Sequence, residues 1–370
     1  MYIYAIIVLV WLITDRLSNP KSIQQSGHKR WSLCLKSAIP LILIMGLRHV
    51  SVGSDTEQYQ YRYEISKSMM VDDNYQWEVG YNYINYLFHD ILHLDFQFFL
   101  LFVSLFFCIV LARFIYYYSK SPLFSFYLHL TIGIFIMSIS GIRQCIAISF
   151  CYMAFMLLQN SKERDIKSLI FSLLMIAIAF TFHNSAIIFS PFLCFLFYRY
   201  RLSKNGAFIW IIVGMSSIVI KGLLGPYIMA LAPQKYENMS LSTNYAANIL
   251  VLIIPIVIAL FCLFFSKTEK DGKYSCLLST MFVFISMVIF FINMMSLNNQ
   301  IGRLAMYFQY SYLILIPYCI ETMPKTESKI WKPIIILICA LFFIIGNSGD
   351  IMQGDEYHFF WENVIWRPKG

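Results

Sequence analysis

Charge is scarce in this sequence, and so are the motifs of nucleotide-driven and soluble enzymes. Only 13% of the 370 residues are Asp, Glu, Lys or Arg, whereas 59% are hydrophobic, a balance that excludes an ordinary soluble domain. No Walker A loop, GxSxG elbow or GxGxxG fingerprint occurs in a supporting context. This argues against an ATP-driven pump and against a hydrolase of the soluble type.

Paired cysteines are also missing. The nine cysteines form no CxxC motif, and most lie inside apolar runs, as Cys108, Cys194 and Cys262 do. Such cysteines are typical of buried small hydrophobic residues, not of a disulfide or zinc framework. The net charge of +8 is only a weak pointer to nucleic acid, because Lys and Arg lie mostly in short loops, where they set membrane orientation and contact anionic headgroups. We therefore expect no nucleic-acid partner.

Long apolar runs, in contrast, recur along the whole chain. They are long enough to cross a hydrocarbon core about 30 Å thick, and each is closed by a short polar loop. This pattern predicts an all-α, polytopic integral membrane protein, with one membrane domain over residues 1–370 and about twelve transmembrane helices. The predicted helices lie near 2–14, 32–47, 96–118, 122–139, 142–159, 167–182, 184–200, 206–224, 247–266, 276–296, 303–320 and 332–346.

Some segments depart from this regular pattern. The N-terminal run lacks a basic n-region and a small-residue cleavage site, so we interpret it as a retained helix and not as a signal peptide. The first, second and last helices are expected to be short or interrupted, the second by Lys36 and Pro40. A further amphipathic stretch, 81–93, is expected to lie at the membrane interface or to re-enter the membrane.

The distribution of basic residues predicts the topology. Alternate loops hold 19 of the 28 Lys and Arg residues, and the positive-inside rule makes these loops cytoplasmic. Both termini and the opposite loops, 48–95 and 225–246, then lie outside, as does the tail 347–370. The unusual polar residues near helix ends all fall on this outer face: Arg48, Asp55, Glu78, Arg143, His183 and Arg303. Ionisable groups at membrane depth are costly to desolvate, which makes these residues functional candidates.

The arginines of this set favour an anion site. Arg143 opens the fifth predicted helix, His183 precedes the seventh, and Arg303 opens the eleventh. All three helices run from outside to inside, so their positive dipole ends and free N–H groups face outward. With Arg48 from the end of the second helix, these ends suit a diphosphate, since Arg offers a planar fork to phosphate oxygens. The alternative is that each Arg is an interfacial anchor that snorkels to headgroups.

Two residues are candidates for a general base. Asp55 follows Gly53, where the chain can turn, and its carboxylate could accept a proton from a sugar hydroxyl. It could equally be the N-cap of a helix that begins at Thr56. His183 is the second candidate, because imidazole changes charge near physiological pH, and a satisfied capping histidine is the competing interpretation. Glu78 is the other conspicuous carboxylate.

The pair His89 and His93, at i and i+4, is a possible metal pair. The stretch has no HExxH glutamate and no distant third ligand, so we expect these residues to form the polar face of an interfacial helix. We predict no metal site. A divalent ion near Asp72 and Asp73 is an alternative that the sequence leaves open.

Several short motifs, taken in order, are similar to those of one family. They are Arg48 with Val52-Gly-Ser-Asp55 and Tyr59, Glu78-Val-Gly80, Gly141-Ile-Arg-Gln144, Phe182-His-Asn-Ser185, and Arg303 with Tyr307. Together they resemble the EpsG-like family of exopolysaccharide polymerases, which is commonly grouped with the Wzy-type O-antigen polymerases. The resemblance spans about 40–310 and agrees with the expected number of helices.

The resemblance implies a glycosyltransferase of the bacterial inner membrane, with its active face in the periplasm. Its substrates would be oligosaccharide units on undecaprenyl diphosphate, as donor and as acceptor, with no cofactor. The implied diphosphate-binding residues are Arg48, Arg143 and Arg303, with Gln144, Tyr59, Glu78 and Tyr307 beside them. Asp55 or His183 would take the proton from the attacking hydroxyl. Membrane lipid is an expected partner, and a chain-length regulator protein is a possible one.

Two other functions compete with this interpretation. A flippase or transporter of lipid-linked sugar also needs a cationic cavity, but it would place charges near the bilayer midplane and show internal repeats, and no convincing repeat is present. A membrane O-acyltransferase needs a His with a carboxylate and an acyl donor from the cytoplasm. The predicted outer position of His183 disfavours it.

Overall fold

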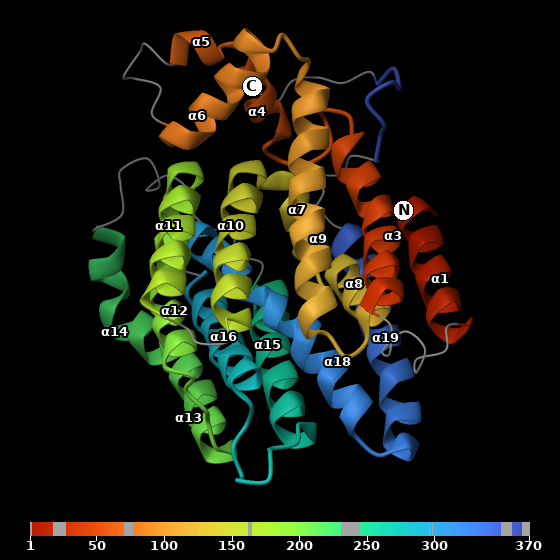
Figure 1. Ribbon diagram of the computed structural model, residues 1–370, viewed down its shortest axis with the longest axis vertical. Helices are drawn as coiled ribbons and strands as arrows, with labels where there is room; N and C mark the ends of the chain where they lie inside the picture. Colours follow the sequence, from red (N-terminus) through yellow and green to blue (C-terminus); the bar gives the residue numbers. More distant parts are fainter. Residues whose placement is uncertain are drawn as a thin grey trace. The chain divides into compact units, whose positions relative to one another are not determined.

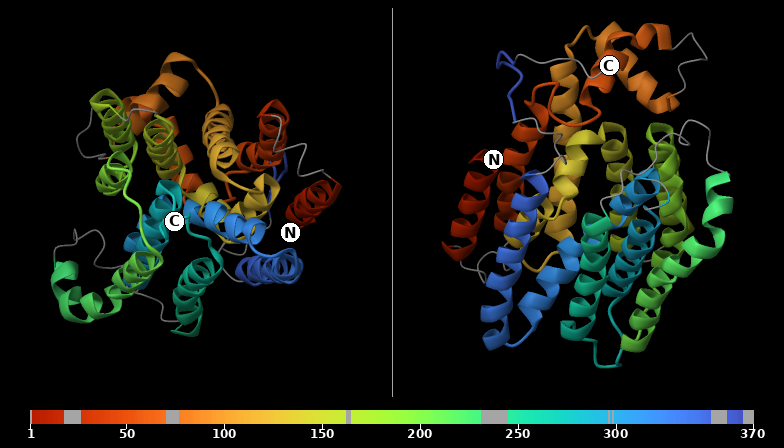
Figure 2. Two further views of the ribbon diagram at one scale, coloured as in Figure 1. Left: turned by 60° about the horizontal axis from the view of Figure 1, so that its bottom comes forward. Right: turned by 180° about the vertical axis from the view of Figure 1, so that it is seen from behind.

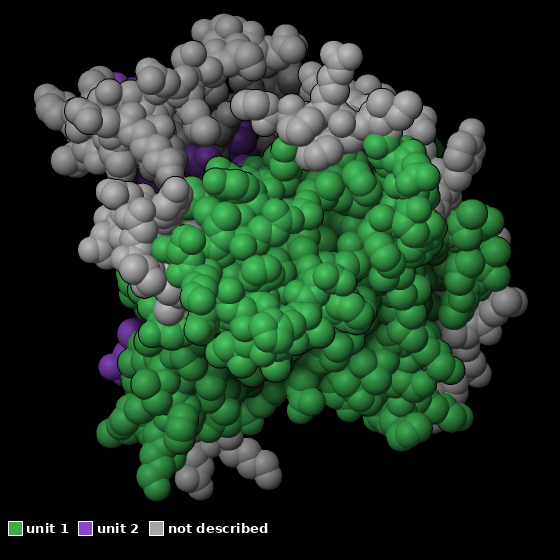
Figure 3. All heavy atoms as spheres, turned by 90° about the horizontal axis from the view of Figure 1, so that it is seen from above, with its two compact units in different colours: residues 1–190, 333–370 green, residues 191–332 purple. Residues whose placement is uncertain are grey.

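The computed structural model describes residues 2–17, 27–69, 77–161, 165–230, 245–295, 297, 299–348 and 357–364. Within these ranges the chain is helical, with two isolated β-bridges and no strand (Figure 1), which confirms the all-α prediction. The chain divides into two compact units: unit 1 comprises 1–190 and 333–370, and unit 2 comprises 191–332 (Figure 3). Unit 2 is therefore an insertion in the sequence of unit 1. The prediction of a single membrane domain stays a prediction.

Unit 1 is built on a set of packed apolar helices. Helix α7 packs against both α3 and α10, and α10 packs in turn against α11 (Figures 1 and 2). Helix α7 is apolar nearly all round, so it is buried by neighbours on more than one face. The helices of unit 1 are α1 (Tyr2–Leu17), α3 (Gly27–Gly46), α4 (Thr56–Glu64), α5 (Ser66–Met69), α6 (Val79–Tyr86), a π-helical turn η1 (Leu87–Ile91), α7 (Phe96–Tyr118), α8 (Pro122–Thr131), α9 (Ile134–Ser140), α10 (Ile142–Asn160), α11 (Ile166–Phe182) and the 3₁₀-helix η2 (Asn184–Phe189).

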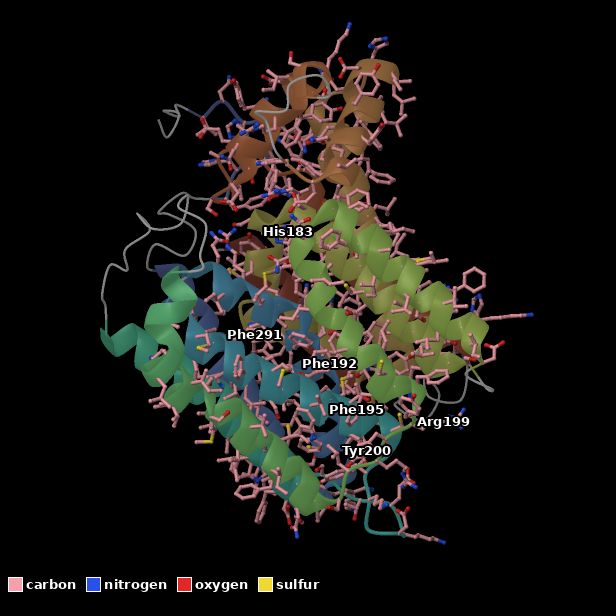
Figure 4. All side chains as sticks on the ribbon, turned by 90° about the vertical axis from the view of Figure 1, so that its left-hand side faces the viewer. His183, Phe192, Phe195, Arg199, Tyr200 and Phe291 are labelled. Atoms are coloured by element: carbon pink, nitrogen blue, oxygen red, sulfur yellow. The ribbon has the colours of Figure 1, made fainter. Side chains whose placement is uncertain are left out.

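Unit 2 surrounds a central helix, α16, which packs against α13, α14, α15 and α18. An apolar cavity of about 490 Å³ lies among Phe192, Phe195, Tyr200 and Trp210, the first three of which are labelled in Figure 4. The elements of unit 2 are α12 (Ser190–Phe197), α13 (Lys204–Met215), α14 (Ser217–Ala230), α15 (Tyr245–Phe265), α16 (Cys276–Met294), α17 (Asn299–Arg303), the 3₁₀-helices η4 (Leu304–Tyr307) and η5 (Gln309–Ser311), and α18 (Tyr312–Thr322). Helix α19 (Lys325–Ser348) begins in unit 2 and continues in unit 1.

Twelve membrane spans are not confirmed. Among the described residues, four helices are long and apolar enough to cross a membrane: Phe96–Tyr118, Ile142–Asn160, Lys204–Leu223 and Cys276–Met294. A fifth span results if α8 and α9, which meet at a bend of 60°, are counted as one. The bend occurs at Gly133, whose φ of +86° is a left-handed conformation that favours glycine. The chain is thus a membrane protein in which, among the described helices, α8 and α9 form one sharply bent pair.

Three further predictions about helices need correction. Helix α3 begins at Gly27 and runs without interruption through Pro40, and α19 likewise continues through Pro333. Arg303 does not open a long helix but is the last residue of α17, because the chain from 304 to 311 winds into tight 3₁₀ turns. The stretch 81–93 is not one amphipathic α-helix, since it passes from α6 into the π-helical turn η1.

Loops that the topology places on one side lie together in unit 1. At one end, Arg30 Nε donates to the Tyr116 carbonyl at 2.8 Å, which joins the start of α3 to the end of α7, two helix ends predicted to face the cytoplasm. At the other end, His49 N–H donates to the His358 carbonyl at 2.8 Å, which joins the outer loop to the segment 357–364. The assignment of this second end to the periplasm stays a prediction.

Close packing of α6 on α11 fixes the position of the residue before α6. A Cβ atom added at Gly80 would overlap Thr181 Oγ1 and lie 2.9 Å from the Thr181 carbonyl oxygen. Only glycine allows the two backbones to approach so closely. Glu78, at the N-cap of α6, is therefore held beside the end of α11.

We expect Gly80→Ala to loosen this contact and to destabilise the protein. The side-chain hydroxyl of Thr181 can rotate, but its carbonyl oxygen cannot, so α6 must shift, and overpacking of this kind costs about 1–3 kcal/mol. The measurement is thermal stability in detergent. Gly222→Ala is the control, since a Cβ atom there meets no described atom within 4 Å. Equal stability of the two variants would contradict this packing.

Candidate functional site

The Glu78 carboxylate joins three distant parts of unit 1. Its Oε2 accepts a hydrogen bond from Arg143 Nη1, and its Oε1 lies 3.0 Å from His183 Nδ1. The backbone N–H of Asn184 also donates to Oε1, at 3.3 Å. The Glu78 side chain is only 9% exposed. A buried carboxylate is thus satisfied by a cation, an imidazole and a backbone amide.

Helix ends position these groups. Glu78 is the extended residue before α6, Arg143 is the second residue of α10, and His183 is the extended residue that ends α11. His183 lies at this end of α11 in Figure 4. Phe150 and Phe182 stack with their ring centroids 5.7 Å apart, which holds α10 and α11 together below the site. The three polar groups are therefore carried by regular elements with little freedom to separate.

An aromatic wall covers the Arg143 guanidinium. Its central carbon lies 4.0 Å from the centroid of the Trp77 ring and 5.9 Å from that of Tyr59, within the range of cation–π attraction. Tyr59, Trp77 and Tyr81 form a triangle of rings with centroids 5.3 to 5.7 Å apart. We call Tyr59, Trp77 and Tyr81 the aromatic wall. It shields the ion pair from water on that side.

The charge state of Glu78 determines what His183 can do. Burial alone would raise the pKa of the Glu78 carboxyl, but the hydrogen bond with His183 and the charge of Arg143 outweigh it and lower this pKa to about 2. An ionised carboxylate only accepts hydrogen bonds, so the proton of neutral His183 must be on Nδ1. Its Nε2 then keeps a lone pair and can act as a base, as in other carboxylate–histidine pairs.

Arg48 has a different environment from Arg143. It is 2% exposed, and its guanidinium donates to the carbonyls of Met45, in the last turn of α3, and Ile139, in the last turn of α9. A cation at two helix C-termini compensates their negative dipole ends. Burial lowers the pKa of this guanidinium to about 10, so it is still charged at neutral pH. The prediction that Arg48 binds diphosphate stays a prediction, since these donors are directed at carbonyls.

Asp55 and Gln144 lie on the same side of unit 1. Asp55 occupies the N-cap position of α4, but its carboxylate makes no capping hydrogen bond and instead accepts one from Ser54 Oγ at 3.0 Å. Ser54 N–H in turn donates to Ser140 Oγ at 3.3 Å, which places this loop at the start of α10. Gln144 is 4% exposed in the first turn of that helix. Whether Asp55 acts as a base stays open.

Arg303 and Tyr307 belong to unit 2. Tyr307 is fully buried in the 3₁₀ turn η4. The prediction that they belong to a diphosphate site stays a prediction. Glu78, Arg143 and His183 all belong to unit 1.

The histidine pair forms no helical face. His89 lies in η1, 3.4 Å from Asp90, whereas His93 follows the helix in a left-handed conformation with φ of 51°. In the described parts of the chain, no group of three or more His, Cys, Asp or Glu side chains could hold a metal ion. Asp72 and Asp73 lie outside the described residues.

The sequence alone did not predict which side chains of this site pair with one another. It named Glu78, Arg143 and His183 separately, without predicting that the Glu78 carboxylate links the other two, and it did not single out Trp77. The signal for Trp77 was its position directly before Glu78. With aromatic residues at 18% of the chain, that position alone is weak evidence.

The fold and the site define an all-helical membrane protein with a half-buried cluster of Glu78, Arg143 and His183, the Glu78 cluster, at one end of unit 1. A comparison with known protein families matches residues 31–353 to the EpsG family. The chain belongs to this family, which confirms the resemblance of its motifs. No curated protein and no solved structure matches the chain. Family membership suggests a role like that of a polysaccharide polymerase.

We expect Glu78→Gln to destabilise the protein at neutral pH by about 3 kcal/mol, because it leaves the mostly buried Arg143 without its counter-charge. The carboxyl pKa is lower in the folded chain than its ordinary value of 4.5. Its stabilising contribution is therefore present above pH 4.5 and is lost as the pH falls towards 2. The free energy of unfolding, compared between pH 6 and pH 3, should differ less between wild type and variant at the lower pH.

The matched control for this experiment is Glu64→Gln, an exposed residue at the end of the neighbouring helix α4. We expect it to leave the free energy of unfolding nearly unchanged at both pH values. A deficit of Glu78→Gln that grows as the pH falls would contradict the assigned charge state of Glu78.

Proposed function

We propose that this protein is a membrane glycosyltransferase that polymerises oligosaccharide units carried on undecaprenyl diphosphate, at the periplasmic face of the bacterial inner membrane. Membership of the EpsG family supports a polymerase-like role. The observation that carries the proposal is that one carboxylate, Glu78, holds both a cation, Arg143, and a base candidate, His183. A reaction in which a sugar hydroxyl loses a proton while an anionic diphosphate leaves needs both groups in one place.

In the proposed reaction, the hydroxyl oxygen of the acceptor sugar attacks the anomeric carbon of the donor glycan. The new glycosidic C–O bond forms as the C–O bond to diphosphate breaks, and undecaprenyl diphosphate leaves with the electron pair. The hydroxyl proton passes to His183 Nε2. Glu78 fixes the orientation of the imidazole and stabilises the imidazolium that results, without taking the proton itself.

Arg143 is the proposed ligand of the leaving diphosphate. One of its terminal nitrogens binds Glu78, and the guanidinium has five N–H donors in all, so donors remain for phosphate oxygens. It is carried in the first turn of α10, whose N-cap, Gly141, offers no side chain to the free backbone N–H groups. The positive end of this 19-residue helix adds to the attraction for an anion.

His183 is favoured over Asp55 as the base because its ring is oriented by an ionised partner. The Asp55 carboxylate accepts a hydrogen bond from its sequence neighbour Ser54, a neutral hydroxyl and not an ionised group. The remaining predicted ligands, Arg48, Arg303 and Tyr307, are not needed for the transfer step as proposed here. A chain-length regulator would act on the product length and not on this chemistry.

We expect Arg143→Ala to remain in the membrane but to abolish chain extension, so that cells make surface glycan of a single repeat unit. Arg143→Lys should restore part of the activity, since it keeps the charge and loses the planar fork. The readout is the length ladder of surface polysaccharide on a gel, with protein abundance measured in the same membranes. Arg113→Ala, an exposed arginine beside Tyr117, is the control and should give a normal ladder. A normal ladder from Arg143→Ala would remove this residue from the mechanism.

We expect His183→Gln to lower the rate of polymerisation about 10²- to 10⁴-fold, the usual contribution of a general base. The rate is measured with purified protein and lipid-linked units in detergent, where there is no membrane to cross. Polymer formed by wild type under these conditions also argues against a pure flippase. Asp55→Asn is tested in parallel and should lose far less activity. The opposite order of the two variants would make Asp55 the base.

A further inference from the structure

A cavity of about 450 Å³ opens at the same end of unit 1 as the Glu78 cluster. The polar residues of its wall are His49, Gln60, Glu64, His89, Asp95 and Gln97, and Phe360 of the segment 357–364 is among its aromatic residues. A second cavity of about 400 Å³ adjoins it, and the two share His89, Leu94 and Asp95 in their walls. This is the size range of small-molecule sites.

The lining favours a neutral, hydroxyl-rich ligand. Two carboxylates, two amides and the imidazoles of His49 and His89 offer the acceptors and donors that bind hydroxyl groups. None of the described residues that line the first cavity is Lys or Arg, so an anionic diphosphate would be repelled by Glu64 and Asp95. The ring of Phe360 is 45% exposed and presents a flat apolar face, on which the C–H face of a sugar ring can pack.

Helix α4 relates the cavity to the reaction centre. Tyr59 belongs to the aromatic wall beside Arg143, and Tyr63, one turn later, lines the cavity. Successive turns of a helix are about 5.4 Å apart. The Tyr63 hydroxyl donates to the Leu94 carbonyl at 2.6 Å, so this ring forms a fixed partition. A ligand in the cavity is therefore near the Glu78 cluster but does not touch it.

We infer that this cavity is a subsite for a neutral sugar of the glycan, remote from the reacting sugar. The inference rests on the proposed function, because it takes the glycan as substrate. Such a subsite would hold the repeat unit in register with His183 and Arg143. Binding energy from a remote part of the substrate can in this way be used to orient the reacting groups.

The test uses the purified full chain in detergent and methyl glycosides of glucose, galactose, N-acetylglucosamine and N-acetylgalactosamine as probes. Saturation-transfer NMR measures their binding. The double variant Glu64→Gln and Asp95→Asn removes both carboxylates, and Asn keeps the N-cap preference at residue 95. We expect at least one glycoside to bind wild type and to lose affinity about tenfold in the double variant. Glu57→Gln, which is on α4 but not part of the cavity wall, should bind as wild type does.

Inorganic pyrophosphate should not displace the bound glycoside. Displacement by pyrophosphate, equal affinity in wild type and double variant, or no binding by any of the four probes would overturn the inference. These outcomes do not depend on polymer formation. Glycoside binding that is lost in the double variant, together with a normal ladder from Arg143→Ala cells, would support the sugar subsite and overturn the proposed mechanism.

Discussion

A carboxylate buried inside a membrane protein has to be neutralised by its surroundings, and unit 1 meets this constraint at Glu78. The partners of Glu78 lie 65 and 105 residues further along the chain, at Arg143 and His183. Each is held at the end of a helix, so the ion pair forms only when α6, α10 and α11 are packed together. The same interaction sets the tautomer of His183, covers Arg143 with the aromatic wall and brings a base beside a cation. Stability and proposed chemistry therefore depend on one group.

Arg48 illustrates how an ionisable residue near a helix end can have a structural purpose. Its guanidinium binds carbonyls in the last turns of α3 and α9, where the dipoles of both helices are negative. Arg143 has the opposite location, at the positive end of α10, and its counter-charge has to come from a side chain. The three arginines predicted to lie near helix ends on one face, Arg48, Arg143 and Arg303, looked equivalent in the sequence. The helix ends they occupy distinguish the two arginines of unit 1. Arg48 lies at helix C-termini and compensates their negative dipole ends, whereas Arg143 lies at a helix N-terminus and adds to the positive end that attracts anions.

Much of the helix pattern was predictable because apolar runs are long and closed by polar loops. The bounds of α7 and α10 agree with the prediction to within one residue. The bend at Gly133 and the 3₁₀ turns after Arg303 were not predictable, since they depend on backbone conformation and packing, which leave no periodic signal. The site residues could be named from their polarity, but their pairing could not. Contacts over 65 and 105 residues arise only from the tertiary fold.

The segment 357–364 lies on the loop after α3: the carbonyl of Leu47 accepts a hydrogen bond from the N–H of Phe360, and Arg48 forms an isolated bridge with Phe359. Unit 2 lies between these two parts in the sequence. A ribosome that has just released α3 must therefore add about three hundred further residues before that loop can gain its last partner. Domains usually fold as they emerge, N-terminal parts first. Here the first unit to begin assembly gains its last contacts only when synthesis is nearly over.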